Sequence, residues 1–274
     1  MRIRLSLAVA FCFAAIILAN WARADDEQEA EASKRFQAYA KETAAKYQLK
    51  SAGAEARPLK LREESLLRWT NPLTANKAHG ELFLWTDRGR PAAVLSMYEY
   101  TDAMGTVHEH HEWASLSLGP IQASGPKEWS PLTAGIELKP VPDAPPPDDT
   151  PLRRLRQMRD IGAKFTSDKT TRQNETRLLR LLNQPAHRYE PGGDPEVLDG
   201  ALFALVEATD PEVFLVLEAR LVNGKPVWHY GFVRMNSVRV SASYQGKQVW
   251  VAEALAARDT YDRKDLPYTA LRIK

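Results

Sequence analysis

The chain has 274 residues, 44% of them apolar, with 37 basic and 35 acidic residues. Three of the arginines precede residue 25, so the remainder is nearly neutral and has no basic surface typical of nucleic-acid or anionic-membrane binding. The length allows one large domain or two small ones.

Residues 1–24 have the three parts of a secretory signal peptide. Arg2 and Arg4 give a basic start, an apolar run follows, and Ala22 to Ala24 has the Ala-x-Ala form of a cleavage site. The run is shorter than the roughly 20 residues that a spanning helix needs, and no later stretch approaches that length. We therefore expect an exported protein, periplasmic or secreted, with no integral membrane segment in its mature chain.

The one cysteine, Cys12, lies within this leader. Its removal would leave a cysteine-free mature chain that relies on its core instead of on disulfides. Such a chain suits a bacterial periplasm or envelope.

Residues 25–138 predict a first lobe. An amphipathic helix is expected from Asp25 to about Gln48, because apolar residues recur there at helical spacing. Three strand-like runs follow, at 81–86, 92–100 and 106–118, joined by turns that contain Asp and Gly. This order indicates an antiparallel meander.

Residues 139–151 are rich in proline and predict a linker, because proline cannot donate a backbone hydrogen bond and favours extended geometry. Residues 152–274 then predict a second lobe. Helical spacing resumes from Leu152 to about Phe165, and further strand-like runs follow.

The second lobe resembles the first at a fixed offset of 120 residues. The run Gly200 to Phe203 matches Gly80 to Phe83, and Pro211 falls on Pro91. This match predicts an internal repeat.

The clearest turn is Asn223-Gly224, since both residues tolerate the positive φ angles of a type I′ hairpin. Pairing residue 222 with residue 225 predicts one core face that carries Leu215, Leu217 and Leu221 beside Trp228, Tyr230 and Phe232. Further strands are expected on both sides of Gln245-Gly246.

These elements predict an α+β fold of two similar halves, each a helix followed by an antiparallel β-meander. The alternative is a single larger β-sandwich or barrel with flanking helices, in which the proline-rich segment crosses between strands.

Three segments resemble a family of secreted bacterial proteins of the planctomycete type. They are Leu82 to Pro91, Leu182 to Pro191, and the run from Asp199 through Asp210-Pro211-Glu212 to Arg220. The resemblance implies export and a shared fold, and the family brings no known activity.

The densest cluster of chemically reactive side chains is Val107 to Trp113. If Thr101 pairs with Thr106, strand alternation puts His108, His110, Glu112 and Glu99 on one face. Two imidazoles and a carboxylate can bind a divalent metal such as Zn²⁺, although the spacing matches no established metal motif. The competing interpretation is a solvated polar face.

A second polar pair follows from the Asn223-Gly224 register, which puts Glu218 directly opposite His229. The two groups could share a proton or form an ordinary cross-strand ion pair.

No nucleophile motif and no phosphate-binding glycine loop occur in the chain. We therefore expect a non-enzymatic binding or envelope-associated protein that contacts an unknown protein or envelope component, without nucleic acid and without a cofactor. The alternative is a metal-dependent hydrolase that uses the His-x-His-x-Glu strand.

Overall fold

A computed structural model describes residues 31–53, 56–71, 78–102, 104–189 and 193–273. The expected signal peptide and Cys12 lie outside these residues. A helix covers residues 31–45, inside the segment for which the sequence predicts one. The strands and the other helices belong to a compact unit that begins at Ala44.

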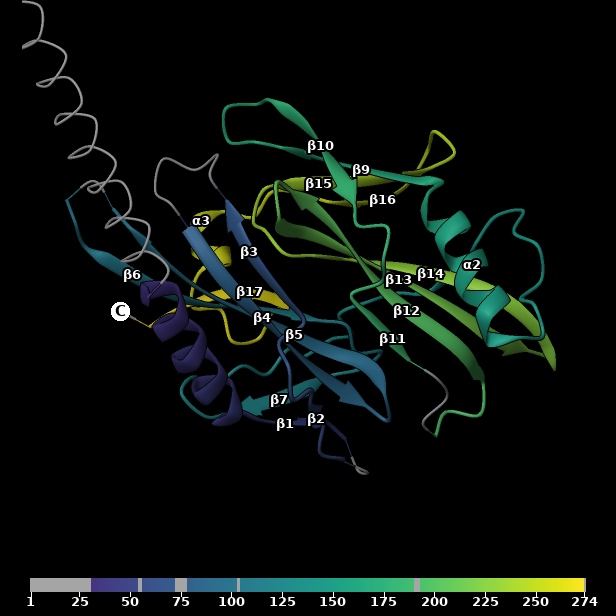
Figure 1. Ribbon diagram of the computed structural model, residues 1–274, viewed down its shortest axis with the longest axis horizontal. Coiled ribbons are helices and arrows are strands. Elements are labelled where there is room, and N and C mark those ends of the chain that lie inside the picture. Colours follow the sequence, from purple (N-terminus) through teal and green to yellow (C-terminus); the bar gives the residue numbers. More distant parts are fainter. Residues whose placement is uncertain (1–30, 54–55, 72–77, 103, 190–192, 274) are drawn as a thin grey trace, which may run out of the picture. The chain divides into compact units, whose positions relative to one another are not determined.

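Strands dominate this unit, and every pairing between them is antiparallel (Figure 1). The first sheet contains, in spatial order, β17 (Tyr268–Arg272), β6 (Val107–Ser115), β5 (Arg90–Thr101), β4 (Ala78–Asp87) and β2 (Lys60–Leu61), and β3 (Leu67–Asn71) also pairs with β4. The second sheet contains β16 (Lys247–Ala252), β15 (Arg239–Tyr244), β9 (Phe165–Thr170), β10 (Thr176–Leu181), β12 (Val197–Glu207), β13 (Asp210–Val222), β14 (Lys225–Arg234) and β8 (Lys139–Pro140), and β11 (His187–Tyr189) pairs with β12. A separate pair joins β1 (Gln48–Ser51) to β7 (Ile121–Ser124).

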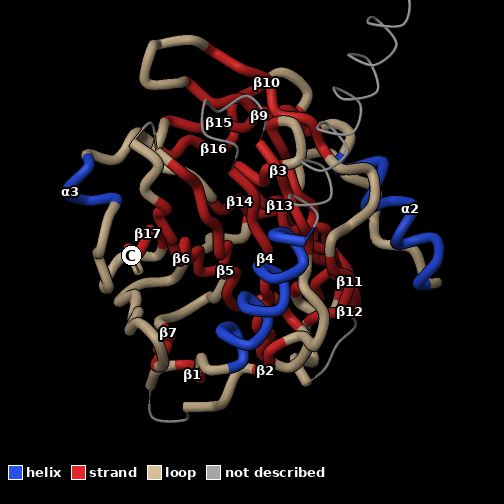
Figure 2. Tube along the Cα trace, turned by 60° about the vertical axis from the view of Figure 1, so that its left-hand side comes forward, coloured by secondary structure: helices blue, strands red, loops and turns tan. Residues whose placement is uncertain are grey.

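The predicted α+β fold of two helix-plus-meander halves is wrong, because the protein is mostly β (Figure 2). Helix α2 (Pro151–Gly162) buries only Met158, Ile161 and Gly162, and α3 (Ala257–Thr260) is a single turn. Neither helix forms a layer. The second sheet instead curls around its own core, which fits the sandwich or barrel alternative.

Strands also cross between the expected halves. The late strand β17 pairs with β6 and completes the first sheet, and β8, at the start of the proline-rich segment, pairs with β14. Helical and strand periodicity identify each element locally, but neither specifies its partner strand.

The two sheets share a core. Leu82, Leu84 and Val94 of the first sheet pack in one cluster with Leu202, Phe214 and other residues of the second. The alternate residues of β12 and β13 enter a second cluster inside the curled sheet. Both faces of these strands are therefore buried, which explains their nearly continuous apolar sequences.

Helix α2 begins where the sequence supplies start signals. Thr150 caps it by accepting a hydrogen bond from the backbone N–H of Arg153, and Pro151 occupies the first turn, where no intrahelical partner is lost. The helix predicted after the proline-rich segment is thus confirmed.

The Asn223-Gly224 hairpin has the predicted register, since Val222 pairs with Lys225. Both turn residues have positive φ, 51° and 76°.

A Cβ at Gly224 would contact nothing within 4 Å, so its replacement tests backbone strain alone. Gly224→Ala should lower the free energy of unfolding by about 1 kcal/mol in urea titrations, and an unchanged midpoint would contradict this expectation.

Two hairpins agree in detail at the 120-residue offset. The β4–β5 pairing shifts register between Trp85 and Thr86, and the β12–β13 pairing shifts between Leu205 and Val206. The strand beside each hairpin places an aromatic ring against a glycine. Trp69 lies opposite Gly80 and Tyr189 opposite Gly200, and a Cβ on either glycine would come within 2.4 Å of that ring.

Among the described residues, no helix has the length and apolar character needed to cross a membrane.

Candidate functional site

Strand β6 carries the predicted histidine cluster, but its register differs by one residue from the prediction. Thr101 pairs with Val107, so five residues form the turn, and Glu99 lies opposite Glu109. A one-residue shift reverses the face of every side chain on a strand. Glu99 is therefore on the opposite face from His108, His110 and Glu112, and the predicted four-residue set does not converge.

The three remaining members have separate partners. His108 Nε2 donates to Asp102 Oδ2 at 2.9 Å. The ring of His110 stacks on those of Tyr98 and Tyr100, with centroids 5.2 and 5.6 Å apart. Glu112 accepts a hydrogen bond from the hydroxyl of Tyr268. In the described part of the chain, no group of three or more His, Cys, Asp or Glu side chains is arranged to hold a metal ion.

The other face of β6 is also enclosed. His111 contacts Tyr47 Oη at 2.6 Å through Nδ1 and Glu109 Oε1 at 3.3 Å through Nε2, and the side chains of His111 and Glu109 are fully buried. Both side chains therefore have polar contacts inside the sheet packing.

Burial lowers the pKa of His110 to about 4, and the neighbouring charges of His108 and Arg272 add to this effect. Its Nδ1 has no hydrogen-bond partner among the described residues. We expect the imidazole to stay neutral at pH 5.5, and an NMR titration assigned with a His110→Gln variant would measure this. A midpoint near the ordinary value of about 6.5 would contradict it.

Glu218 and His229 lie directly opposite each other, as the hairpin register predicts. Their side chains have other partners. Glu218 accepts from Arg90 Nε at 2.6 Å, from Tyr189 Oη at 2.5 Å and from Arg220 Nη1 at 2.9 Å, whereas His229 Nδ1 lies 3.3 Å from the carbonyl of Val227.

A cleft of about 930 Å³, which we call the acidic cleft, is lined by many ionisable and aromatic side chains. Of the predicted site residues, only Glu112 lines it. Its aromatic lining residues are Trp69, Tyr98, Tyr100, Tyr261 and Tyr268, and its acidic ones are Glu112, Glu175, Glu207, Asp210 and Glu212. Its volume is typical of small-molecule sites.

Burial raises the pKa of two cleft carboxyls that have no salt bridge among the described residues. For Glu112 it reaches about 8, since burial and the Glu212 charge outweigh the hydrogen bond from Tyr268 and the charge of Arg234. The pKa of Asp210 is well above its ordinary value because of burial and the charges of Glu212 and Glu112. Asp210 Oδ2 accepts a hydrogen bond of 3.2 Å from Asn71 Nδ2.

The other buried acids of the cleft are paired. Lys169 Nζ lies 2.7 Å from Glu207 Oε2 and also bonds Glu212, and Arg177 Nη1 lies 3.2 Å from Glu207 Oε1. Burial would raise the pKa of Glu207, but Lys169 and Arg177 lower it below its ordinary value. The cleft thus contains ion pairs, together with Arg172, beside two carboxyls that form no salt bridge among the described residues and feel the charges of Arg234 and Lys169 only from a distance.

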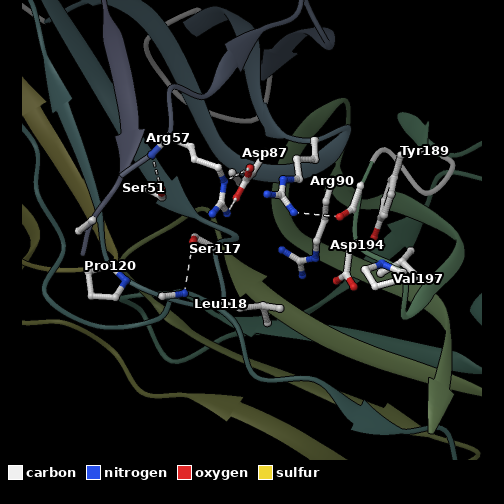
Figure 3. Close-up of a pocket in the computed structure, with 16 residues that line it drawn as sticks. Ser51, Arg57, Asp87, Arg90, Ser117, Leu118, Pro120, Tyr189, Asp194 and Val197 are labelled. Carbon is white, nitrogen blue, oxygen red and sulfur yellow. Dashed lines mark hydrogen bonds and ion pairs between the residues drawn. The ribbon is translucent and has the colours of Figure 1, made fainter. Parts of the chain in front are cut away.

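A smaller cavity of about 430 Å³ lies where hairpin β4–β5 meets the second sheet, and Figure 3 shows Arg57, Asp87, Arg90 and Tyr189 around it. Arg57 pairs with Asp87 at 2.9 Å, and Arg90 pairs with the fully buried Glu218. Burial would raise the pKa of Glu218, yet Arg90 and the hydrogen bonds from Tyr189 and Arg220 lower it. Arg57 and Arg90 of this cavity thus each have an acidic partner, whereas Arg88 donates to the backbone carbonyl of Gly193.

The two cavities occupy corresponding positions at the 120-residue offset. The pair Arg57–Asp87 of the smaller cavity corresponds to Arg177–Glu207 of the acidic cleft. Tyr189 corresponds to Trp69. The Arg90–Glu218 ion pair has no such equivalent. Asp210 stands at the position that matches Arg90, and Tyr98 stands at the position that matches Glu218.

Sequence reasoning missed Asp210, Glu212, Trp69 and Tyr98 as cleft residues. The offset contained a usable signal, because it aligns the acid Asp210 with the base Arg90 in two hairpins of matching register. A comparison of charges at matched positions would have marked this site.

Comparison of the chain with protein families, curated proteins and solved structures gives no match.

Proposed function

We propose that the protein is an exported, non-enzymatic binding protein whose ligand occupies the acidic cleft. The observation that supports this most is the combination of an open volume of about 930 Å³ with aromatic side chains and carboxyls of strongly raised pKa. Carboxyls are moved into low-dielectric surroundings at a cost in stability, and such groups concentrate at functional sites.

The ligand-binding role is favoured over metal-dependent hydrolysis by the contacts of β6. His108 bonds Asp102, and His110 lies within a stack of aromatic rings instead of facing a common centre with Glu112. We also propose that the matched hairpins derive from an internal duplication, and that the two cavities are its equivalent sites.

The proposal is tested by screening the purified protein against sugars, amines, amino acids and short peptides by thermal shift. Ser237→Trp would place an indole in the acidic cleft, and Ser117→Trp makes the same change in the smaller cavity. A true ligand should raise the melting temperature of the wild type and of Ser117→Trp, but not that of Ser237→Trp. A ligand effect that survives in Ser237→Trp, or no ligand in any class, would refute the cleft as the binding site.

A further inference from the structure

The acidic cleft lacks a positive charge at the position where the smaller cavity has one. In the smaller cavity, Arg90 and Glu218 form a buried ion pair at 2.6 Å. At the corresponding positions of the cleft stand Asp210 and Tyr98, an acid and a phenol. The hairpin therefore presents a carboxyl to a site whose counterpart contains a complete pair.

Glu112 reinforces this imbalance. It lines the same cleft on β6, and among the described residues neither it nor Asp210 lies within ion-pair distance of a lysine or arginine, whereas Glu207 and Glu212 share Lys169. A buried carboxyl without a counter-ion is costly, and a bound cation would offset that cost.

The lining favours an organic cation over a metal ion. No group of three or more metal-binding side chains occurs in the described ranges, and divalent ions in proteins generally need at least three such ligands. Aromatic side chains stand beside the carboxyls instead, namely Trp69, Tyr98, Tyr100 and Tyr261. Aromatic rings attract ammonium groups, particularly quaternary ones.

We propose that the acidic cleft binds a ligand through an organic ammonium group, which Asp210 and Glu112 neutralise and the neighbouring aromatic side chains contact. This inference rests on the proposed binding function and specifies the chemical class of the ligand. The ammonium takes the place that the guanidinium of Arg90 has in the smaller cavity.

Two matched probe pairs test the charge requirement by calorimetry at pH 9. Choline is compared with 3,3-dimethylbutan-1-ol, which has carbon in place of nitrogen, and Nα-acetyl-lysinamide with Nα-acetyl-norleucinamide. At least one ammonium compound should bind tenfold or more tightly than its uncharged partner. Preference in the first pair indicates a small quaternary ammonium, and preference in the second a peptide lysine.

Variants then locate the interaction. Asp210→Asn keeps the shape of the side chain and should lower the affinity for the preferred probe at least tenfold. Asp194→Asn, in the smaller cavity, should leave the affinity for that probe unchanged. Equal binding of charged and uncharged probes, binding of neither ammonium compound, or binding that Asp210→Asn does not weaken would overturn the inference. If an uncharged ligand is nevertheless displaced by Ser237→Trp, the binding function stands and only the ammonium assignment fails.

Discussion

Replacing Arg90 with methionine should lower the free energy of unfolding by about 3 kcal/mol, because it leaves the carboxylate of Glu218 buried with fewer compensating charges. The side chain of Glu218 is fully buried and that of Arg90 is 13% exposed. The pair also joins the first sheet to the second. Urea unfolding at neutral pH would measure the loss.

Two further variants show whether the loss arises from charge. Arg57→Met makes the same change in the same cavity, but Arg57 and Asp87 are 40% and 28% exposed, so we expect a loss of about 1 kcal/mol or less. Combining Arg90→Met with Glu218→Gln should recover at least half of the loss, since the amide still accepts from Tyr189. Equal losses of unfolding free energy for Arg90→Met and Arg57→Met would show that the burial of the Arg90–Glu218 pair does not determine the loss.

The contribution of Glu112 to the stability of the protein should fall as the pH rises from about 4.5 to about 8, and Glu112→Gln should remove that contribution. Folding raises the pKa of Glu112 to about 8, so in this range the folded protein holds a proton that the unfolded chain has released. The resulting cost is absent below the ordinary pKa and complete above pH 8. Glutamine imitates the protonated acid and still accepts from Tyr268.

The variant and the wild type should therefore have similar melting temperatures near pH 4.5. At pH 8 the variant should be more stable by an amount on the order of 2 to 4 kcal/mol. Glu128→Gln, which removes an exposed carboxyl that pairs with Lys264, controls for the change in net charge. A difference in stability between Glu112→Gln and the wild type that stays constant across this pH range would contradict the raised pKa of Glu112.

The two hairpin registers show why one was predictable and the other was not. Asn223-Gly224 has a specific turn chemistry with two residues, and its pairing follows directly. The turn between β5 and β6 has five residues, and Asp102 Oδ1 accepts from the backbone N–H groups of Met104 and Thr106, each at 2.9 Å. Such a side-chain contact adds a residue to the turn, and nothing in the alternation of neighbouring strands reveals it.

The strands themselves were largely predictable, since β4, β5, β6, β13, β14, β15 and β16 fall within or near the expected runs. The acidic cleft was not, because it forms where residues far apart in the chain meet. Asn71 and Asp210, for example, are 139 positions apart and join at 3.2 Å. Local periodicity contains no information about such contacts, whereas the 120-residue offset does, since it compares positions that pair alike in the two hairpins.

The pairing of β17 with β6 sets an order for the folding process. Residues 268–272 must be synthesised before the outer edge of β6 acquires its partner, more than 150 residues after that strand itself has been synthesised. Until then β6 presents an unpaired edge that can join another chain. Pairings of such long range slow folding and extend the exposure of aggregation-prone intermediates. The nascent protein should therefore depend on holding chaperones more than its stable final sheets suggest.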